Sequence, residues 1–190
     1  MSKTKLAVSL AAALFLAGCA QPAAKPEASV ATPVKVDRTR TEMNRDDGRA
    51  RIVLRNLTDA DRTAFRSVSA EVFNGRALLM GAVTKPEQKR RAEQLAKGVD
   101  GVAEVLNELV LAEDAALAAF AAQPGQDMAL RGKVLSDESV KGFYSVRVVN
   151  GVAYVMGVSP SAEESERVKA LVLDSPGVKW AVLHVQQAGK

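Results

Sequence analysis

The sequence has very little of what catalysis and metal binding normally require. Its 190 residues include one cysteine and one histidine, and aromatic residues make up only 4% of the chain. One cysteine and one histidine rule out almost every catalytic or metal site that is built from thiols, zinc ligands or imidazoles. We therefore predict that the protein is not an enzyme and that it has no metal and no cofactor.

A strong charge of one sign is also lacking. The chain has 26 Lys and Arg against 22 Asp and Glu, and two of the cations, Lys3 and Lys5, lie in a segment that we expect to be removed. The remaining 24 cations and 22 anions leave a net charge of +2, which is too weak to indicate nucleic-acid binding. We predict no nucleic-acid partner.

The apolar run near the N-terminus is too short to span a membrane. It extends from Leu6 to Leu16, eleven residues, whereas a transmembrane helix needs roughly 20. Lys3 and Lys5 precede this run, and a short cationic segment before an apolar one is typical of a secretory signal peptide. The sequence therefore predicts export.

The only cysteine stands directly after this run. Residues 16–19 read Leu-Ala-Gly-Cys and resemble the lipobox of bacterial lipoproteins, which implies a signal peptide at 1–18 and lipidation of Cys19, including palmitate. Several acyl chains make such an anchor effectively permanent. The next residue is Ala20 and not aspartate, which by the same resemblance implies the outer membrane, with the folded part in the periplasm. A plain secretory signal that happens to end in cysteine is the alternative.

The segment after the cysteine is expected to be a flexible linker, residues 19–47. It contains Pro22, Pro26 and Pro33, with mixed charges and no sustained apolar period. Such a composition cannot bury enough apolar surface to offset the entropy lost on ordering. The linker would hold the folded part away from the membrane surface.

The rest of the chain contains an internal repeat. A shift of 76 residues superimposes residues 69–111 on a second copy without a gap. The coincidences include Asn74-Gly75 with Asn150-Gly151, Met80-Gly81 with Met156-Gly157, and Gly101-Val102 with Gly177-Val178. The sequence therefore predicts two homologous modules, residues 48–112 and 126–187, joined by a linker at 113–125.

The pattern within each module predicts an α+β fold with the order α-β-β-α-β. An Asn-Gly pair between two alternating apolar segments is typical of a two-residue hairpin turn. An apolar helical stripe and a last strand follow, and a short amphipathic segment precedes the hairpin. We expect a three-stranded mixed sheet with two helices on one face. The predicted strands are 68–73, 76–83 and 103–111 in the first module, and 144–149, 152–158 and 179–187 in the second.

Strand alternation leaves one apolar face on each sheet, opposite the predicted helices. Such a face is normally covered by protein, either another part of the same chain or a partner. The single histidine is expected to be a polar residue on this face. In the second module the face includes Tyr154, Met156, Trp180, Val182 and His184, and in the first it includes Phe73, Leu78, Met80, Leu106 and Val110.

Both modules resemble a known domain family. Residues 69–81 read Ser-Ala-Glu-Val-Phe-Asn-Gly-Arg-Ala-Leu-Leu-Met-Gly, and residues 101–107 read Gly-Val-Ala-Glu-Val-Leu-Asn. These strings resemble the BON domain, whose hallmark is a V-x-x-G-x-V-x-L-x-G hairpin followed by a G-V-x-x-V-x-N strand. The resemblance covers residues 46–112 and 126–187, although the last strand of the second module lacks the asparagine. With its lipobox, the chain is similar to dual-BON outer-membrane lipoproteins.

This resemblance implies a non-catalytic protein that binds anionic phospholipid, such as phosphatidylglycerol or cardiolipin, through its second BON domain and supports cell-envelope integrity. A cation near an anionic membrane contributes about 1 kcal/mol, and an aromatic side chain can sit at headgroup depth. A basic group on the first module, Lys85, Lys89, Arg90 and Arg91, is the rival site by charge alone. The lipid-binding candidates in the second module are Arg131, Lys133, Lys141, Phe143 and Tyr144.

Two other functions stay open on the sequence. One is a scaffold that binds a protein partner, such as an envelope-assembly or cell-wall factor. The other is a chaperone-like role in the periplasm. Binding to vesicles with and without anionic lipid separates the lipid-binding function from the scaffold.

Overall fold

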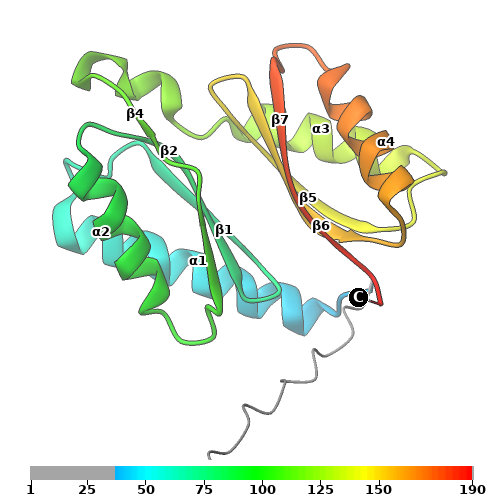
Figure 1. Ribbon diagram of the computed structural model, residues 1–190, viewed down its shortest axis with the longest axis horizontal. Helices are drawn as coiled ribbons and strands as arrows, with labels where there is room; N and C mark the ends of the chain where they lie inside the picture. The colour runs from blue at the N-terminus through cyan, green and yellow to red at the C-terminus, as the bar shows by residue number, and fades with distance from the viewer. Residues whose placement is uncertain (1–36, 190) are drawn as a thin grey trace, which may run out of the picture. The chain divides into compact units, whose positions relative to one another are not determined.

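The computed structural model describes residues 37–189, which form two α/β modules (Figure 1). The predicted Cys19 anchor lies outside the described residues. Within 37–189, no helix combines the length and apolarity needed to cross a bilayer. The elements are α1 (Arg40–Asp61), β1 (Val68–Phe73), β2 (Arg76–Val83), α2 (Pro86–Lys97), β3 (Glu104–Asn107), β4 (Val110–Leu111), η1 (Asp114–Phe120), α3 (Pro124–Ser136), β5 (Phe143–Val149), β6 (Val152–Ser159), α4 (Ala162–Leu173) and β7 (Trp180–Gln187).

The first module is a mixed sheet covered on one face by α1 and α2. Strand β1 pairs antiparallel with β2, and β3 pairs parallel with β2 on its other side. The core between sheet and helices contains Val53 and Leu57 from α1, Ala92 and Ala96 from α2, and Leu79 from β2. The apolar stripe predicted for the helix after the hairpin faces this core.

The second module repeats this arrangement with α3 and α4. Its sheet has the order β5-β6-β7, antiparallel between β5 and β6 and parallel between β6 and β7. Leu130 and Val134 of α3 and Val168 and Val172 of α4 pack on Val155 and its neighbours in the sheet. The predicted α+β class, with two α-β-β-α-β modules, is confirmed.

Both hairpins depend on residues that tolerate a positive φ. Asn74 and Gly75 have φ values of 51° and 73°, and Asn150 and Gly151 have 49° and 77°. Two consecutive residues in the left-handed backbone conformation form a turn whose twist matches the right-handed twist of the hairpin strands. The Asn-Gly pairs therefore fix the register in which β1 pairs with β2 and β5 with β6.

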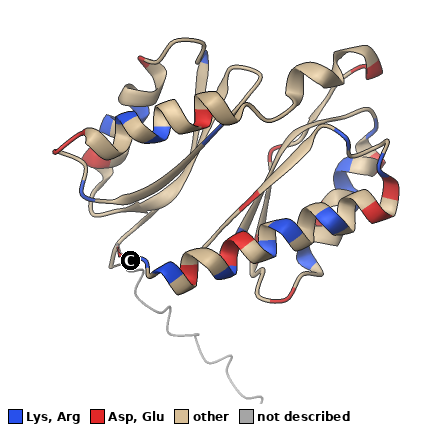
Figure 2. Cartoon of the chain, turned by 180° about the vertical axis from the view of Figure 1, so that it is seen from behind, with Lys and Arg blue, Asp and Glu red and all other residues tan. Residues whose placement is uncertain are grey.

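The first helix begins earlier than predicted, so the expected linker at 19–47 is corrected for residues 40–47. Thr39 and Glu42 form a reciprocal capping box at the start of α1. Asp46, which is buried, accepts hydrogen bonds from Arg38, from Arg49 at 2.9 Å and from the Asn74 amide at 2.7 Å. Charged residues of both signs interleave along α1 (Figure 2), and this polarity led to the prediction of a linker.

The last strand of the first module is also corrected, because it is broken where a single strand was expected at 103–111. The Asn107 side chain donates to the Lys89 carbonyl in α2 at 3.0 Å and accepts from the Leu109 amide at 3.4 Å. This interruption turns Leu109 into the core, where it is 1% exposed, and separates β3 from β4. The second module has no asparagine there, and β7 is continuous.

The two sheets also pack against each other through the faces that their helices leave open. Phe73, Leu78 and Met80 of the first module form one buried cluster with Tyr154 and Met156 of the second. Both modules belong to one compact unit of the chain. Most of the two apolar faces is therefore covered by the same chain, which is one of the two alternatives that the sequence left open, but Val110 and Trp180 stay exposed.

Candidate functional site

The two aromatic candidates for lipid contact do not point to solvent. Tyr144 is 3% exposed, lies in the core of the second module and donates a hydrogen bond to Glu164 at 2.8 Å. Phe143 packs at the edge of the sheet interface, with its ring centroid 6.0 Å from that of Phe73 and 5.7 Å from the Arg38 guanidinium. Neither ring stands free beside the predicted cations.

The three basic candidates are also separated by the fold. The Lys133 ammonium donates to the Asp174 carboxylate at 3.1 Å, to the Asp174 carbonyl at 3.2 Å and to Ser175 at 3.2 Å, which attaches α3 to the end of α4. The Lys141 side chain is exposed, and its backbone amide is held by Glu164 at 2.9 Å. Arg131 is the one predicted cation on an exposed face of α3.

That face of α3 carries two apolar residues that the sequence prediction did not assign to the site. Met128 is 76% exposed and Leu135 is 69% exposed, whereas Leu130 and Val134 of the same helix are buried. Met128, Arg131 and Leu135 are spaced by three and four residues, so they share one face of the helix. The four apolar residues of α3 predict amphipathicity, but only tertiary packing shows which of them stay exposed.

A pocket lies beside this face. It has a volume of about 210 Å³ and is lined by residues that include Met128, Arg131 and Arg147. The Asp127 carboxylate also lines it, but Asp127 accepts from the Val148 amide at 2.6 Å and from Arg147 at 3.3 Å. Two guanidinium groups and a methionine therefore surround a space near the surface of the second module.

The rival basic group on the first module lies on α2 and just before it. Lys85, Arg90 and Arg91 are exposed, and Arg90 forms an ion pair with Glu87 at 3.7 Å. The exposed large apolar residues of the described chain do not include any residue of α2. The first module thus presents charge there without an apolar contact.

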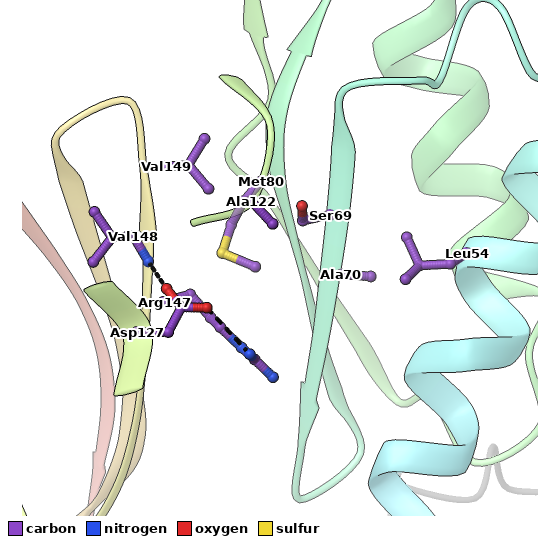
Figure 3. Close-up of a pocket in the computed structure, with 9 residues that line it drawn as sticks. All are labelled: Leu54, Ser69, Ala70, Met80, Ala122, Asp127, Arg147, Val148 and Val149. Carbon is purple, nitrogen blue, oxygen red and sulfur yellow. Dashed lines mark hydrogen bonds and ion pairs between the residues drawn. The ribbon is translucent and has the colours of Figure 1, made fainter. Parts of the chain in front are cut away.

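Arg147 is the central polar residue between the modules. It forms ion pairs with Glu71 of β1 and Asp127 of α3, and Ser145 donates to Glu71 at 2.6 Å. Burial on its own lowers the pKa of the Arg147 guanidinium, but the Glu71 and Asp127 carboxylates outweigh it and raise that pKa. Figure 3 shows Arg147 and Asp127 facing Ser69 and Met80 across a pocket of about 220 Å³.

His184 also lies between the modules. Its Nε2 is 2.9 Å from the Glu108 carboxylate, and its backbone carbonyl accepts from Arg76 at 2.9 Å. Within residues 37–189, no group of three or more His, Cys, Asp and Glu side chains could hold a metal. The histidine of this chain is a polar contact between two sheets.

The predicted partner face therefore divides into two parts. Tyr154 and Met156 are buried in the sheet interface, Val182 is partly buried at its edge, and His184 pairs with Glu108. Trp180 is 71% exposed and is not part of the buried cluster. Only Trp180 remains available to a partner at this face.

The two tyrosines predict a stability change at alkaline pH. Burial, with a smaller effect of Glu164, raises the pKa of Tyr144, and burial together with the Glu108 charge raises the pKa of Tyr154. Above about pH 10 the unfolded chain loses these protons while the folded chain keeps them, so each tyrosine lowers the free energy of unfolding by about 1.4 kcal/mol per pH unit. Stability conferred by the neutral phenols is present below about pH 10 and is lost as the pH rises.

Urea unfolding of the wild type and the Tyr144→Phe variant between about pH 9 and about pH 11 measures this effect. The variant should be less stable at the lower pH by about 1 kcal/mol, because the hydrogen bond to Glu164 is lost. Its free energy of unfolding should then fall less steeply with pH than that of the wild type. Equal slopes would show that Tyr144 titrates alike in both states.

The fold and its contacts define a class of protein: two repeated α/β modules that pack sheet against sheet, with an amphiphilic helix face exposed on the second. A family model for the BON domain matches residues 45–113 and 129–180. The chain belongs to the BON-domain family.

Three curated relatives support this assignment. The chain is 34% identical over 157 residues to the outer membrane lipoprotein DolP of Haemophilus influenzae, with 80% of each chain covered. It is 30% identical to an uncharacterised Anaplasma centrale protein, over 64% of this chain and 82% of the relative. It is 26% identical to the osmotically inducible protein Y of Escherichia coli, over 65% of this chain and 63% of the relative.

Proposed function

We propose that this protein is a non-catalytic outer-membrane lipoprotein that binds anionic phospholipid through the exposed face of α3 and supports cell-envelope integrity. The likeness to the lipoprotein DolP and the lipobox at residues 16–19 support the location. The observation that carries the binding function is the pair of exposed side chains, Met128 and Leu135, on the same helix face as Arg131.

The energetics of this face suit a membrane surface. A leucine or methionine side chain gains about 1.5–3 kcal/mol when it is fully removed from water, and a cation gains about 1 kcal/mol near anionic headgroups. Insertion of Met128 and Leu135 at the boundary between headgroups and acyl chains would bring the pocket lined by Arg131 and Arg147 to headgroup depth. Anionic headgroups such as those of phosphatidylglycerol and cardiolipin would then face the Arg131 guanidinium, whereas Arg147 is already paired with Glu71 and Asp127.

The test uses a lipid-free form, residues 20–190, and vesicles with and without phosphatidylglycerol or cardiolipin. A shorter form that begins after residue 46 would lose the contacts of Asp46 with Arg49 and Asn74. The Met128→Ser/Leu135→Ser variant keeps the net charge and removes the apolar contact, and we expect it to weaken binding to anionic vesicles about tenfold or more. Arg131→Gln should weaken binding by a few fold, since it removes one cation.

Arg90→Gln on the first module is the matched control, because it removes the same charge as Arg131→Gln from a helix without exposed apolar residues. It should change binding by less than about twofold, because a single distant charge is screened within about 10 Å. An equal loss of vesicle binding for Arg90→Gln and Arg131→Gln would show that binding depends on the overall charge of the protein and not on the α3 face. Equal binding to neutral and anionic vesicles would refute the lipid function.

The alternative function, a scaffold for an envelope protein, is supported by the exposure of Trp180. Tryptophan is enriched among the residues that contribute most to protein interfaces, and this one is 71% exposed at the start of β7. Trp180→Ala should leave vesicle binding unchanged if α3 is the lipid-contact surface. A loss of envelope integrity in cells with normal vesicle binding would favour the scaffold.

A further inference from the structure

Residues at equivalent positions of the two repeats contact each other across the sheet interface. Glu71 pairs with Arg147, and Glu108 pairs with His184, and both pairs are separated by 76 residues, the period of the repeat. The buried apolar cluster between the sheets also contains equivalent residues of both repeats: Phe73, Leu78 and Met80 with Val149, Tyr154 and Met156.

This pattern is the signature of twofold symmetry. In an interface between two copies related by a twofold axis, each residue near the axis meets its own equivalent. The two modules are homologous but not identical, so the interface is twofold in its geometry and asymmetric in its side chains. Polar residues supply that asymmetry, because the first module presents Glu71 and Glu108 where the second presents Arg147 and His184.

We propose that these two polar pairs select the partner of each sheet face, so that a first module pairs with a second module and not with another copy of itself. Two first modules in this geometry would place Glu71 against Glu71 and Glu108 against Glu108. Two second modules would place Arg147 against Arg147. Each combination brings like charges together and removes the hydrogen bonds that the present pairs make.

The burial of Glu71 makes the selection effective. The Glu71 side chain is 11% exposed, and it accepts from both Arg147 and Ser145. A second carboxylate in place of Arg147 would leave two anions at low exposure with one hydroxyl donor between them. Like charges repel more strongly where one of them is buried than at an exposed rim, because water screens the buried charge less.

The rule has a consequence for contact between two copies of this chain. Because only unlike modules fit, two chains can use this face only by reciprocal exchange, in which the first module of each pairs with the second module of the other. A mixture of Glu71→Arg chains and Arg147→Glu chains would satisfy both interfaces of such an exchanged pair. Either variant alone has no matching partner.

Thiol labelling measures whether the modules separate. In a form without Cys19, Met80→Cys reports access to the sheet interface, and Ala92→Cys reports access to the core under the helices, because both positions are fully buried in different clusters. Glu71→Arg or Arg147→Glu should raise the labelling rate at position 80 about tenfold or more and leave the rate at position 92 unchanged. The combined Glu71→Arg/Arg147→Glu variant should recover most of the protection.

Recovery should be incomplete, since Asp127 stays beside the new carboxylate at position 147. Faster labelling at position 92 would show that a charge reversal unfolds the module. In that case the milder Glu71→Gln and Arg147→Gln variants test the proposal, because they remove a charge without adding repulsion. They should raise the rate at position 80 by less than the reversals do. Sedimentation of the equimolar mixture of the two reversed variants should give a dimer with one chain of each.

Two results would overturn the proposal. One is labelling at position 80 that is as fast in the combined variant as in the single reversals, because the pair then has no coupling. The other is a homodimer of either reversed variant alone, because like modules would then pair despite matching charges.

Discussion

Replacement of Gly81 by alanine is expected to lower the free energy of unfolding by roughly 3 kcal/mol or more. Gly81 has a φ of +112°, a conformation that residues with a Cβ rarely adopt. A Cβ at this position would also overlap the Ser67 carbonyl oxygen and approach the Cα of Val68 to 3.3 Å. Both groups are backbone atoms at the start of β1, so they cannot move aside without breaking its pairing with β2.

Gly48→Ala is the matched control, because the same methyl group is added at a helical position of α1 with no atom within 4 Å. Alanine loses less backbone entropy than glycine on entering a helix, so this variant should be more stable by about 0.5–1 kcal/mol. Urea unfolding of the two variants should therefore give changes of opposite sign. A stability loss for Gly81→Ala below about 1 kcal/mol would show that β1 can shift to accommodate a Cβ.

Gly157, the equivalent of Gly81 in the second repeat, supports the interpretation that glycine is required here because two strands approach each other closely. A Cβ at Gly157 would lie 2.5 Å from the Phe143 carbonyl oxygen and 2.7 Å from the Tyr144 ring. The sequence identified both glycines through the repeat, as part of the Met-Gly pairs, but not the reason for them. The reason is the distance between neighbouring strands, which depends on the register and not on local sequence.

The fold could be predicted because its determinants are local and occur twice. The Asn-Gly turns set the hairpins, and alternation along the strands divided the residues between the helix-covered face and the sheet interface. Strand alternation also applies to Tyr144 of the candidate site, because Tyr144 alternates with Val146 and Val148 and therefore faces the core with them. Its burial could have been predicted, but lipid contact was predicted because an aromatic residue lies close in sequence to the basic candidates.

The exposed face of α3 could not be predicted in the same way. Met128, Leu130, Val134 and Leu135 are all apolar, and glycines at 125 and 132 weaken the helical pattern, so the sequence does not decide which residues face the sheet. The ion pair between Lys133 and Asp174 joins residues that are far apart in sequence, and no local sequence pattern predicts it. Packing against β5 and α4 determines both outcomes.

Replacement of Cys19 by alanine is expected to abolish lipid attachment completely. Cys19 lies outside the described residues, and the expectation rests on the Leu-Ala-Gly-Cys sequence at 16–19 and on the likeness to the lipoprotein DolP. Several acyl chains hold a protein at a membrane almost irreversibly, because each buried CH₂ contributes about 0.8 kcal/mol. Without them, the α3 face alone would give only weak and reversible binding.

Metabolic labelling with palmitate and membrane fractionation test this expectation. The wild type should carry label in the outer membrane, and Cys19→Ala should carry none and should accumulate as a precursor that keeps residues 1–18 or as a protein outside the membrane fraction. Ala20→Asp is the matched control, because it keeps the thiol and should keep the label while moving the protein towards the inner membrane. The chain has one cysteine, so palmitate label that persists in Cys19→Ala would contradict lipidation at this thiol.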